Sequence, residues 1–124
     1  MIRGALGLFQ RGHHECALCG RDLPNTFLRA AHIKPRRDCT PEERRNIRGI
    51  AMRACVFGCD ALFEERWIAV DSTGTIRVST QARHVEHLRD TLEWLDGRRC
   101  SAWNEDTADH FAWHFQGSLV SNVP

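Results

Sequence analysis

Four of the six cysteines form two closely spaced pairs, an arrangement that suits a metal ion. Two residues separate Cys16 from Cys19, three separate Cys55 from Cys59, and 35 residues lie between the pairs. Each pair can present two thiolates to one tetrahedral ion, and four thiolates suit structural Zn²⁺. We therefore predict a zinc site here. Cys39 lies between the pairs and is an alternative ligand, because the three-residue spacing of the second pair is unusual.

Two carboxylates follow the second cysteine pair at helical spacing. Asp60 comes directly after Cys59, and Glu64 lies four residues further on. On a helix these side chains project from one face and can supply oxygens to one hard cation such as Mg²⁺ or Mn²⁺. Zinc bound at Cys59 would orient the first helical turn and with it Asp60. The alternative is that Asp60 only caps a helix and that Glu64 is a solvated surface acid.

A histidine-containing run precedes these features and completes a known pattern. Three neighbouring features together resemble the signature of HNH endonucleases, most of all restriction-type domains with a cysteine zinc site. They are the run Leu28-Arg29-Ala30-Ala31-His32-Ile33-Lys34-Pro35, the second cysteine pair, and the run Asp60-Ala61-Leu62-Phe63-Glu64. The resemblance spans about residues 16–79. It implies a ββα-metal fold that holds one divalent cation, and it implies His32 as the general base that activates water against a phosphodiester. An imidazole with a pKa near 6.5 can accept that proton at pH 7, and the cation neutralises charge on the phosphate.

Three positions depart from the family pattern. Ala31 stands where many HNH sites have a second histidine, and Asp60 replaces the metal-binding histidine of the helix. Ile50 stands where the middle asparagine is expected, and Asn46 is the nearest asparagine. With so few protein ligands, water and the substrate phosphate must complete the cation's shell, and the oxygen ligands favour Mg²⁺ or Mn²⁺ over Zn²⁺.

Basic residues gather after the histidine. Residues 1–53 contain eleven Lys or Arg and five Asp or Glu, whereas residues 54–124 contain six and eleven. A basic cluster of this kind can contact the phosphate backbone of DNA, although a solvated loop is an equal alternative. The expected DNA contacts are Lys34, Arg36, Arg37, Arg44, Arg45 and Arg48.

The length and composition favour one soluble domain. With 124 residues the chain is of ordinary single-domain size, and we expect one domain over residues 1–124. No apolar run is long enough for a membrane span, and the first ten residues lack the pattern of a signal peptide. We therefore expect a cytoplasmic protein, where reduced thiols favour metal binding over disulfides. A redox role for Cys16 and Cys19 is disfavoured, because no βαβ pattern surrounds them.

Hydrophobic spacing predicts an α+β fold of the HNH or treble-clef type. The first elements are a strand over Thr26–Ile33 with Leu28, Ala30 and His32 on one face, a polar connection over Arg36–Asn46, a strand over Ile50–Val56, a helix over Cys59–Arg66 and a hairpin over Trp67–Ser79. Two helices are then expected in residues 81–116, one over Gln81–Leu95 with Val85, Leu88, Leu92 and Leu95 facing the core, and one over Glu105–Gln116 burying Ala108, Phe111, Ala112 and Phe115.

The sequence thus favours a metal-dependent endonuclease acting on DNA, with RNA not excluded. The chief alternative is a catalytically inactive zinc module on the same fold that binds nucleic acid or protein. One such centre cuts one strand, so double-strand cleavage calls for a homodimer or two visits. The histidine pairs His13/His14, His84/His87 and His110/His114 are at contact spacing, but surface pairs are common and no metal role is predicted for them.

Overall fold

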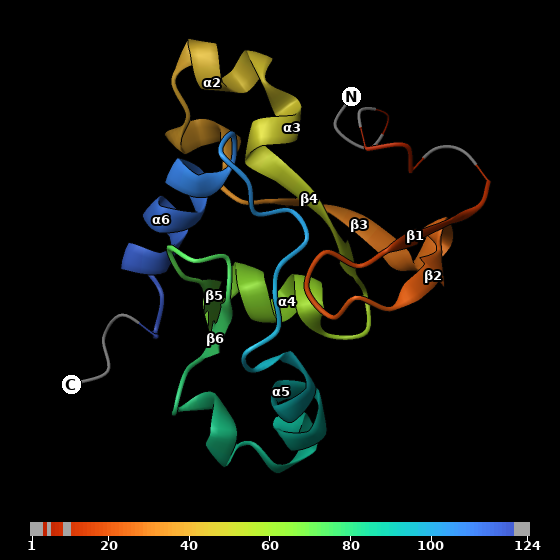
Figure 1. The fold of residues 1–124 in the computed structure, drawn as a ribbon, viewed down its shortest axis with the longest axis vertical. Helices are drawn as coiled ribbons and strands as arrows, with labels where there is room; N and C mark the ends of the chain where they lie inside the picture. Colours follow the sequence, from red (N-terminus) through yellow and green to blue (C-terminus); the bar gives the residue numbers. More distant parts are fainter. Residues whose placement is uncertain (1–3, 5, 9–10, 121–124) are drawn as a thin grey trace.

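The computed structural model describes residue 4, residues 6–8 and residues 11–120. Its strands form three two-stranded antiparallel sheets (Figure 1). The pairs are β1 (His13–Glu15) with β2 (Asp22–Pro24), β3 (Leu28–His32) with β4 (Ala51–Cys55), and β5 (Ile68–Val70) with β6 (Ile76–Val78). The α-helices after residue 40 are α2 (Pro41–Arg45), α3 (Ile47–Ile50), α4 (Cys59–Glu64), α5 (Arg89–Leu95) and α6 (Ala108–Gln116).

The centre of the fold is the strand pair β3–β4 and the helix α4 that follows it. The register pairs Leu28 with Cys55 at one end and His32 with Ala51 at the other. Helix α4 contacts both strands and begins only four residues after β4 ends. Gly58 makes this short connection possible, because its φ of 142° lies in a region that other residues rarely adopt. The expected strands, helix and following hairpin are therefore present close to their predicted bounds.

The connection between β3 and β4 is more ordered than expected. Residues 36–50 form a 3₁₀ turn (Arg36–Asp38) and the helices α2 and α3 rather than an irregular polar loop. Thr40 caps α2: its hydroxyl accepts a hydrogen bond from the Glu43 amide at 3.1 Å, and the Glu43 carboxylate accepts one from the Thr40 amide at 2.8 Å. This capping box and Pro41 in the first turn explain why so polar a segment is helical.

The prediction of one helix over Gln81–Leu95 was wrong in its first half. That half consists of two 3₁₀ turns, Ala82–His84 and Glu86–Leu88, and only Arg89–Leu95 is α-helical. Val85 adopts an extended conformation and is exposed, so it does not belong to a core-facing stripe. Only Ala82 is buried in these turns, and an element with so little apolar surface to bury gains little from a continuous helix.

Helix α6 begins at Ala108, later than predicted, and buries a different face. Its buried residues are Phe111 and His114, whereas Ala112 is exposed. The helix packs on β5, and Figure 1 shows it beside the strands β5 and β6. Because the histidine ring fills the space next to Phe63, the core face runs through His114 rather than through Ala112.

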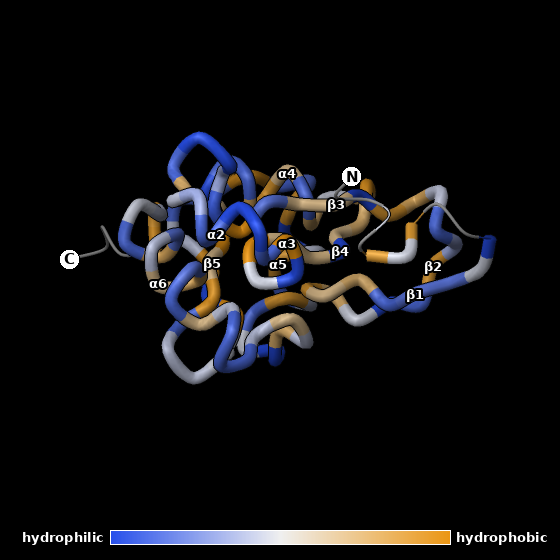
Figure 2. The backbone as a smooth tube through the Cα atoms, turned by 90° about the horizontal axis from the view of Figure 1, so that it is seen from above, coloured by the Kyte–Doolittle hydropathy of each residue, from blue (hydrophilic) through white to orange (hydrophobic). Residues whose placement is uncertain are grey.

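The hydrophobic core joins the zinc-site segments to the hairpin β5–β6 and to the later helices. Its largest fully buried side chains include Phe63, Phe111, Leu18, Ile68 and Leu95. Figure 2 shows hydrophobic colouring along β5 inside the molecule and hydrophilic colouring on β1 at its edge. Among the described residues, no helix has the length and apolar character of a membrane span.

Candidate active site and metal centre

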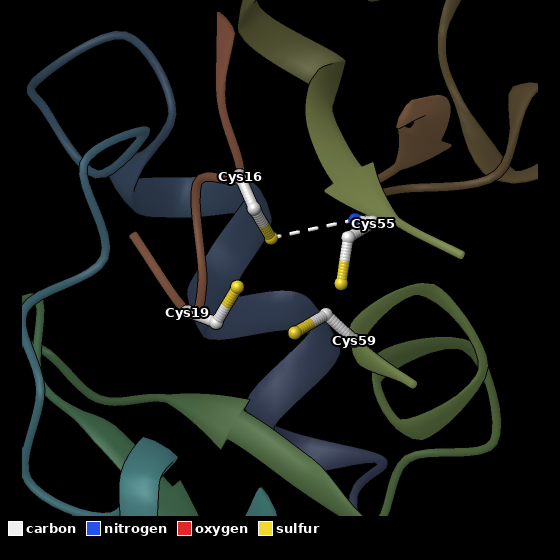
Figure 3. Close-up of side chains that lie close together, drawn as sticks. All are labelled: Cys16, Cys19, Cys55 and Cys59. Atoms are coloured by element: carbon white, nitrogen blue, oxygen red, sulfur yellow. Dashed lines mark hydrogen bonds between the residues drawn. The ribbon is translucent and has the colours of Figure 1, made fainter. Parts of the chain in front are cut away.

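The four paired cysteines converge on one point (Figure 3). Cys16 and Cys19 lie in the turn between β1 and β2, Cys55 ends β4, and Cys59 begins α4. All four are buried, and their sulfur atoms lie within 4.8 Å of one another. Cys39 is elsewhere: its Sγ donates a hydrogen bond to the Pro35 carbonyl at 3.3 Å. The alternative ligand is therefore excluded from this cluster.

The chemistry of the cluster fits a structural zinc ion. A Zn–S distance of about 2.3 Å places tetrahedral ligand sulfurs roughly 3.8 Å apart, within the range of this cluster. No disulfide joins these cysteines. The Cys55 amide donates to Cys16 Sγ at 3.3 Å, as expected for a thiolate ligand. Hydrogen bonds among the four sulfur atoms lower the pKa of Cys19 to about 6 and lower that of Cys55, and they raise the pKa of Cys16 and of Cys59. A divalent ion bound by all four sulfurs would therefore displace the protons that Cys16 and Cys59 retain.

The residues singled out for catalysis share one cleft beside this cluster. It has a volume of about 530 Å³ and is bounded by β3, α4 and α6. His32, Asp60 and Glu64 all contribute to its wall. The remaining residues of the wall are Arg29, Ala30, Ala31, Ile33, Pro35, Arg37, Phe63, Arg66 and His114.

His32 is exposed at the end of β3, and its neighbours on the strand hold it there. Ala31 and Ile33 on either side are buried, so the backbone of this segment is fixed by the core. The predicted face of Leu28, Ala30 and His32 is only partly reproduced, because Leu28 is buried and His32 is not. The buried residues of the strand fix its backbone. Because His32 is exposed at the end of the strand, its imidazole is open to the cleft.

Asp60 and Glu64 stand one turn apart on α4. Asp60 is partly buried, and burial together with the charge of Glu64 raises the pKa of Asp60. The charge of Arg29 acts in the opposite direction but does not cancel this shift. A cation bound beside Asp60 would offset this cost of ionising its carboxylate. The electrostatics of the cleft therefore suit a divalent ion.

The predicted DNA contacts are divided between several environments. Arg37 lines the cleft and its side chain is 82% exposed, and Arg36 and Arg45 are also exposed. Lys34 is only 14% exposed and forms an ion pair with Glu43 at 3.1 Å. The Arg44 Nε donates to the Arg36 carbonyl at 3.0 Å. Arg48 is exposed and lines a second cleft with Arg53 and Asn104. The structure thus brings only Arg37 of this set into the cleft of His32.

His114 and Arg66 are cleft residues that the sequence interpretation did not assign. The His114 ring stacks on Phe63 with 3.6 Å between ring centroids, and its Nε2 hydrogen-bonds to the Phe63 carbonyl at 2.8 Å. Burial lowers the pKa of His114 to about 4, so the ring is neutral at pH 7 and Nε2 carries its proton. The Nδ1 atom of His110 instead lies 3.4 Å from a carboxylate oxygen of Glu43. The hydrophobic spacing of α6 alone gave no indication of this packing.

The remaining residues considered from the sequence lie outside the cleft. Ile50 is buried and its carbonyl accepts a hydrogen bond from the Ile33 amide at 2.7 Å, while Asn46 precedes α3. Neither lines the cleft. Within the described part of the chain, the four cysteines are the one group of three or more metal-binding side chains that share a point. The histidine pairs form no such group.

Comparison with known proteins agrees with the resemblance seen in the sequence. The family model of HNH endonucleases matches residues 16–71. No curated protein matches the chain. Similarity to this family suggests a nuclease-type function with nucleic acid as the substrate. The matched residues 16–71 supply the cysteine cluster, β3, β4 and α4, and this segment is similar to the HNH endonuclease family.

Proposed function

We propose that the protein is a metal-dependent endonuclease that hydrolyses DNA phosphodiester bonds in the cleft between β3, α4 and α6. The single observation that carries this proposal is the shared cleft: His32 comes from β3, Asp60 and Glu64 come from α4, and all three line one wall. A base and two carboxylates from separate elements of an HNH segment are the groups that this hydrolysis needs.

Each residue has a distinct role in the proposed reaction. His32 takes the proton of the attacking water at an imidazole nitrogen, because histidine is the side chain that most often serves as a general base. Asp60 and Glu64 would hold Mg²⁺ or Mn²⁺, which neutralises charge on the scissile phosphate when bound. Arg37 lies in the same wall and attracts the phosphate backbone. The zinc cluster fixes the start of α4 and hence the carboxylates.

The basic helices between β3 and β4 extend the proposed DNA surface. Arg36 and Arg45 are exposed there, whereas Lys34 already has a carboxylate partner in Glu43. We therefore propose that the arginines contact DNA and that Lys34 stabilises the segment. One cleft cuts one strand, so a double-strand break needs a second copy of the chain or a second visit.

Nicking of supercoiled plasmid tests the proposal. Wild type should nick with Mg²⁺ or Mn²⁺ but not with Zn²⁺ alone, and His32→Ala should lower the rate by ~10² to 10⁴. Asp60→Ala should abolish Mg²⁺-dependent nicking, and Glu64→Ala should weaken it less. His84→Ala is the matched control, because His84 is exposed and lies outside the cleft wall.

The same samples distinguish the alternatives. Wild-type protein that binds a DNA duplex but never cuts it would favour a non-enzymatic zinc module. Cleavage of an RNA strand with no cleavage of DNA would redirect the proposal to a ribonuclease. Nicking at the wild-type rate by His32→Ala would show that the base lies elsewhere.

A further inference from the structure

We propose that Arg66 binds a phosphate group of the substrate in the cleft. This proposal rests on the proposed function of the same cleft and assigns it a further substrate contact. Arg66 lies two residues after the helix that carries Asp60 and Glu64, and it lines the same wall as His32.

The backbone at Arg66 has a conformation that ordinarily calls for glycine. Its φ is 65°, and it is the one non-glycine residue with positive φ among the described residues. The Arg66 amide donates to the Phe63 carbonyl at 3.0 Å, and the Trp67 amide donates to the Leu62 carbonyl at 2.9 Å. These two bonds form the Schellman motif that closes a helix, in which this position is usually Gly. Glycine would close α4 without strain, so the backbone gives no reason for an arginine here.

The side chain of Arg66 is held by three parts of the C-terminal segment. Its Nη1 donates to the His114 carbonyl at 3.0 Å, and its Cζ lies 5.0 Å from the centre of the Trp113 ring. Gly117 leaves room for the Arg66 side chain, because a Cβ atom at position 117 would lie 2.5 Å from Arg66 Nη1. A guanidinium carries five N–H donors, and one such hydrogen bond leaves most of them for a ligand.

No carboxylate of the described residues neutralises the Arg66 guanidinium. It forms no ion pair with the described carboxylates, whereas Lys34 and Arg83 both do. A guanidinium that is partly buried, fixed in direction and not neutralised is suited to bidentate binding of a phosphate. The cleft wall also contains Arg29 and Arg37, so its three arginines outnumber its two carboxylates, Asp60 and Glu64.

Arg66→Gly tests the proposal, because a purely structural role and a role in binding predict different results. Glycine relieves the positive φ, so the variant should fold with a Tm close to that of wild type. Its kcat/KM for nicking should nevertheless fall by ~100-fold, the usual loss when one donor to a reacting anion is removed. Millimolar guanidinium should restore part of the activity, since the ion can occupy the vacated space beside Trp113. Arg66→Lys keeps the charge without the fork and should recover activity only in part.

Arg89→Gln is the matched control, because Arg89 is exposed on α5 and lies outside the cleft wall. It should cleave as wild type does, with or without guanidinium. Wild-type activity in Arg66→Gly would overturn the proposal. So would a loss of activity that accompanies a large fall in Tm and that guanidinium does not reverse, because Arg66 would then serve only to join α4 to α6.

A second readout separates this proposal from the proposed function. Affinity for a short DNA duplex is measured with Ca²⁺, which is a hard oxygen-binding cation but is not the proposed catalytic metal. If wild type binds but never cleaves, the proposed function fails, and a roughly tenfold weaker affinity of Arg66→Gly still supports the phosphate contact. Equal affinities of the two proteins would overturn it whether or not wild type cleaves.

Discussion

Mild acid should destabilise the protein through His114. This residue is 3% exposed, stacks on Phe63 and has a pKa lowered to about 4 by burial. In the unfolded chain the same imidazole has a pKa of about 6.5. Above pH 6.5 both states are neutral and stability is unaffected. Between pH 6.5 and 4 the unfolded state binds a proton that the folded state does not, so stability falls as the pH falls.

The size of this effect follows from the difference between the two pKa values. Each pH unit below 6.5 costs about 1.36 kcal/mol until the folded pKa is reached. The free energy of unfolding should therefore drop by about 2 kcal/mol between pH 7 and pH 5 because of this one group. Below pH 4 the loss levels off at roughly 3 kcal/mol.

Urea unfolding of wild type and His114→Phe at pH 7 and pH 5 measures this contribution. Phenylalanine keeps an aromatic ring against Phe63 but leaves the Phe63 carbonyl without its donor, at a cost of about 1 to 3 kcal/mol at either pH. Acid also weakens thiolate binding of zinc, but equally in both proteins. The difference between them should shrink by about 2 kcal/mol at pH 5. An unchanged difference, in this variant and in His114→Asn, would refute the reasoning.

Three further predictions concern the metal sites and the helix cap. Cys16→Ser should lose the bound zinc and unfold, which elemental analysis and circular dichroism would detect; a folded variant with an unchanged Tm would contradict a structural zinc. Asp60→Asn should weaken Mn²⁺ binding at least tenfold while leaving the metal-free stability unchanged or higher, because burial disfavours the charged carboxylate; titration calorimetry and thermal melts check both parts. Thr40→Ala should cost about 1 kcal/mol through loss of the α2 cap, measured by urea unfolding, and an effect near zero would contradict the cap's role.

The features that could be predicted from the sequence are those fixed by local spacing. Two cysteines that are two or three residues apart can bring both sulfur atoms to one ion. Two residues that are four positions apart on a helix, such as Asp60 and Glu64, lie on one face whatever surrounds them. The strands β3 and β4 follow from apolar runs, and the hairpin β5–β6 follows from its glycine-containing turn. The cysteine cluster, the strand pair and α4 were therefore predictable, as was the family.

The features that could not be predicted depend on contacts between distant segments. His114 is buried because Phe63, 51 residues away, offers a ring and a carbonyl to it. The first half of the expected helix over Gln81–Leu95 has no core surface to cover, which its apolar spacing does not reveal. Arg66 read as the last residue of a helix, and its positive φ depends on how α4 closes. The catalytic roles of His32, Asp60 and Glu64 stay predictions.

The packing of α6 on α4 also sets the order in which the molecule can be completed during synthesis. The four clustered cysteines are all present once residue 59 has emerged, so a metal ion that they bind would fix the start of α4 early. The cleft wall, however, includes His114, and the Arg66 side chain is held by Trp113, His114 and the space at Gly117. A growing chain can thus bind a metal ion at a stage when the cleft is still open on one side. The wall is complete only when residues 113–117 have left the ribosome.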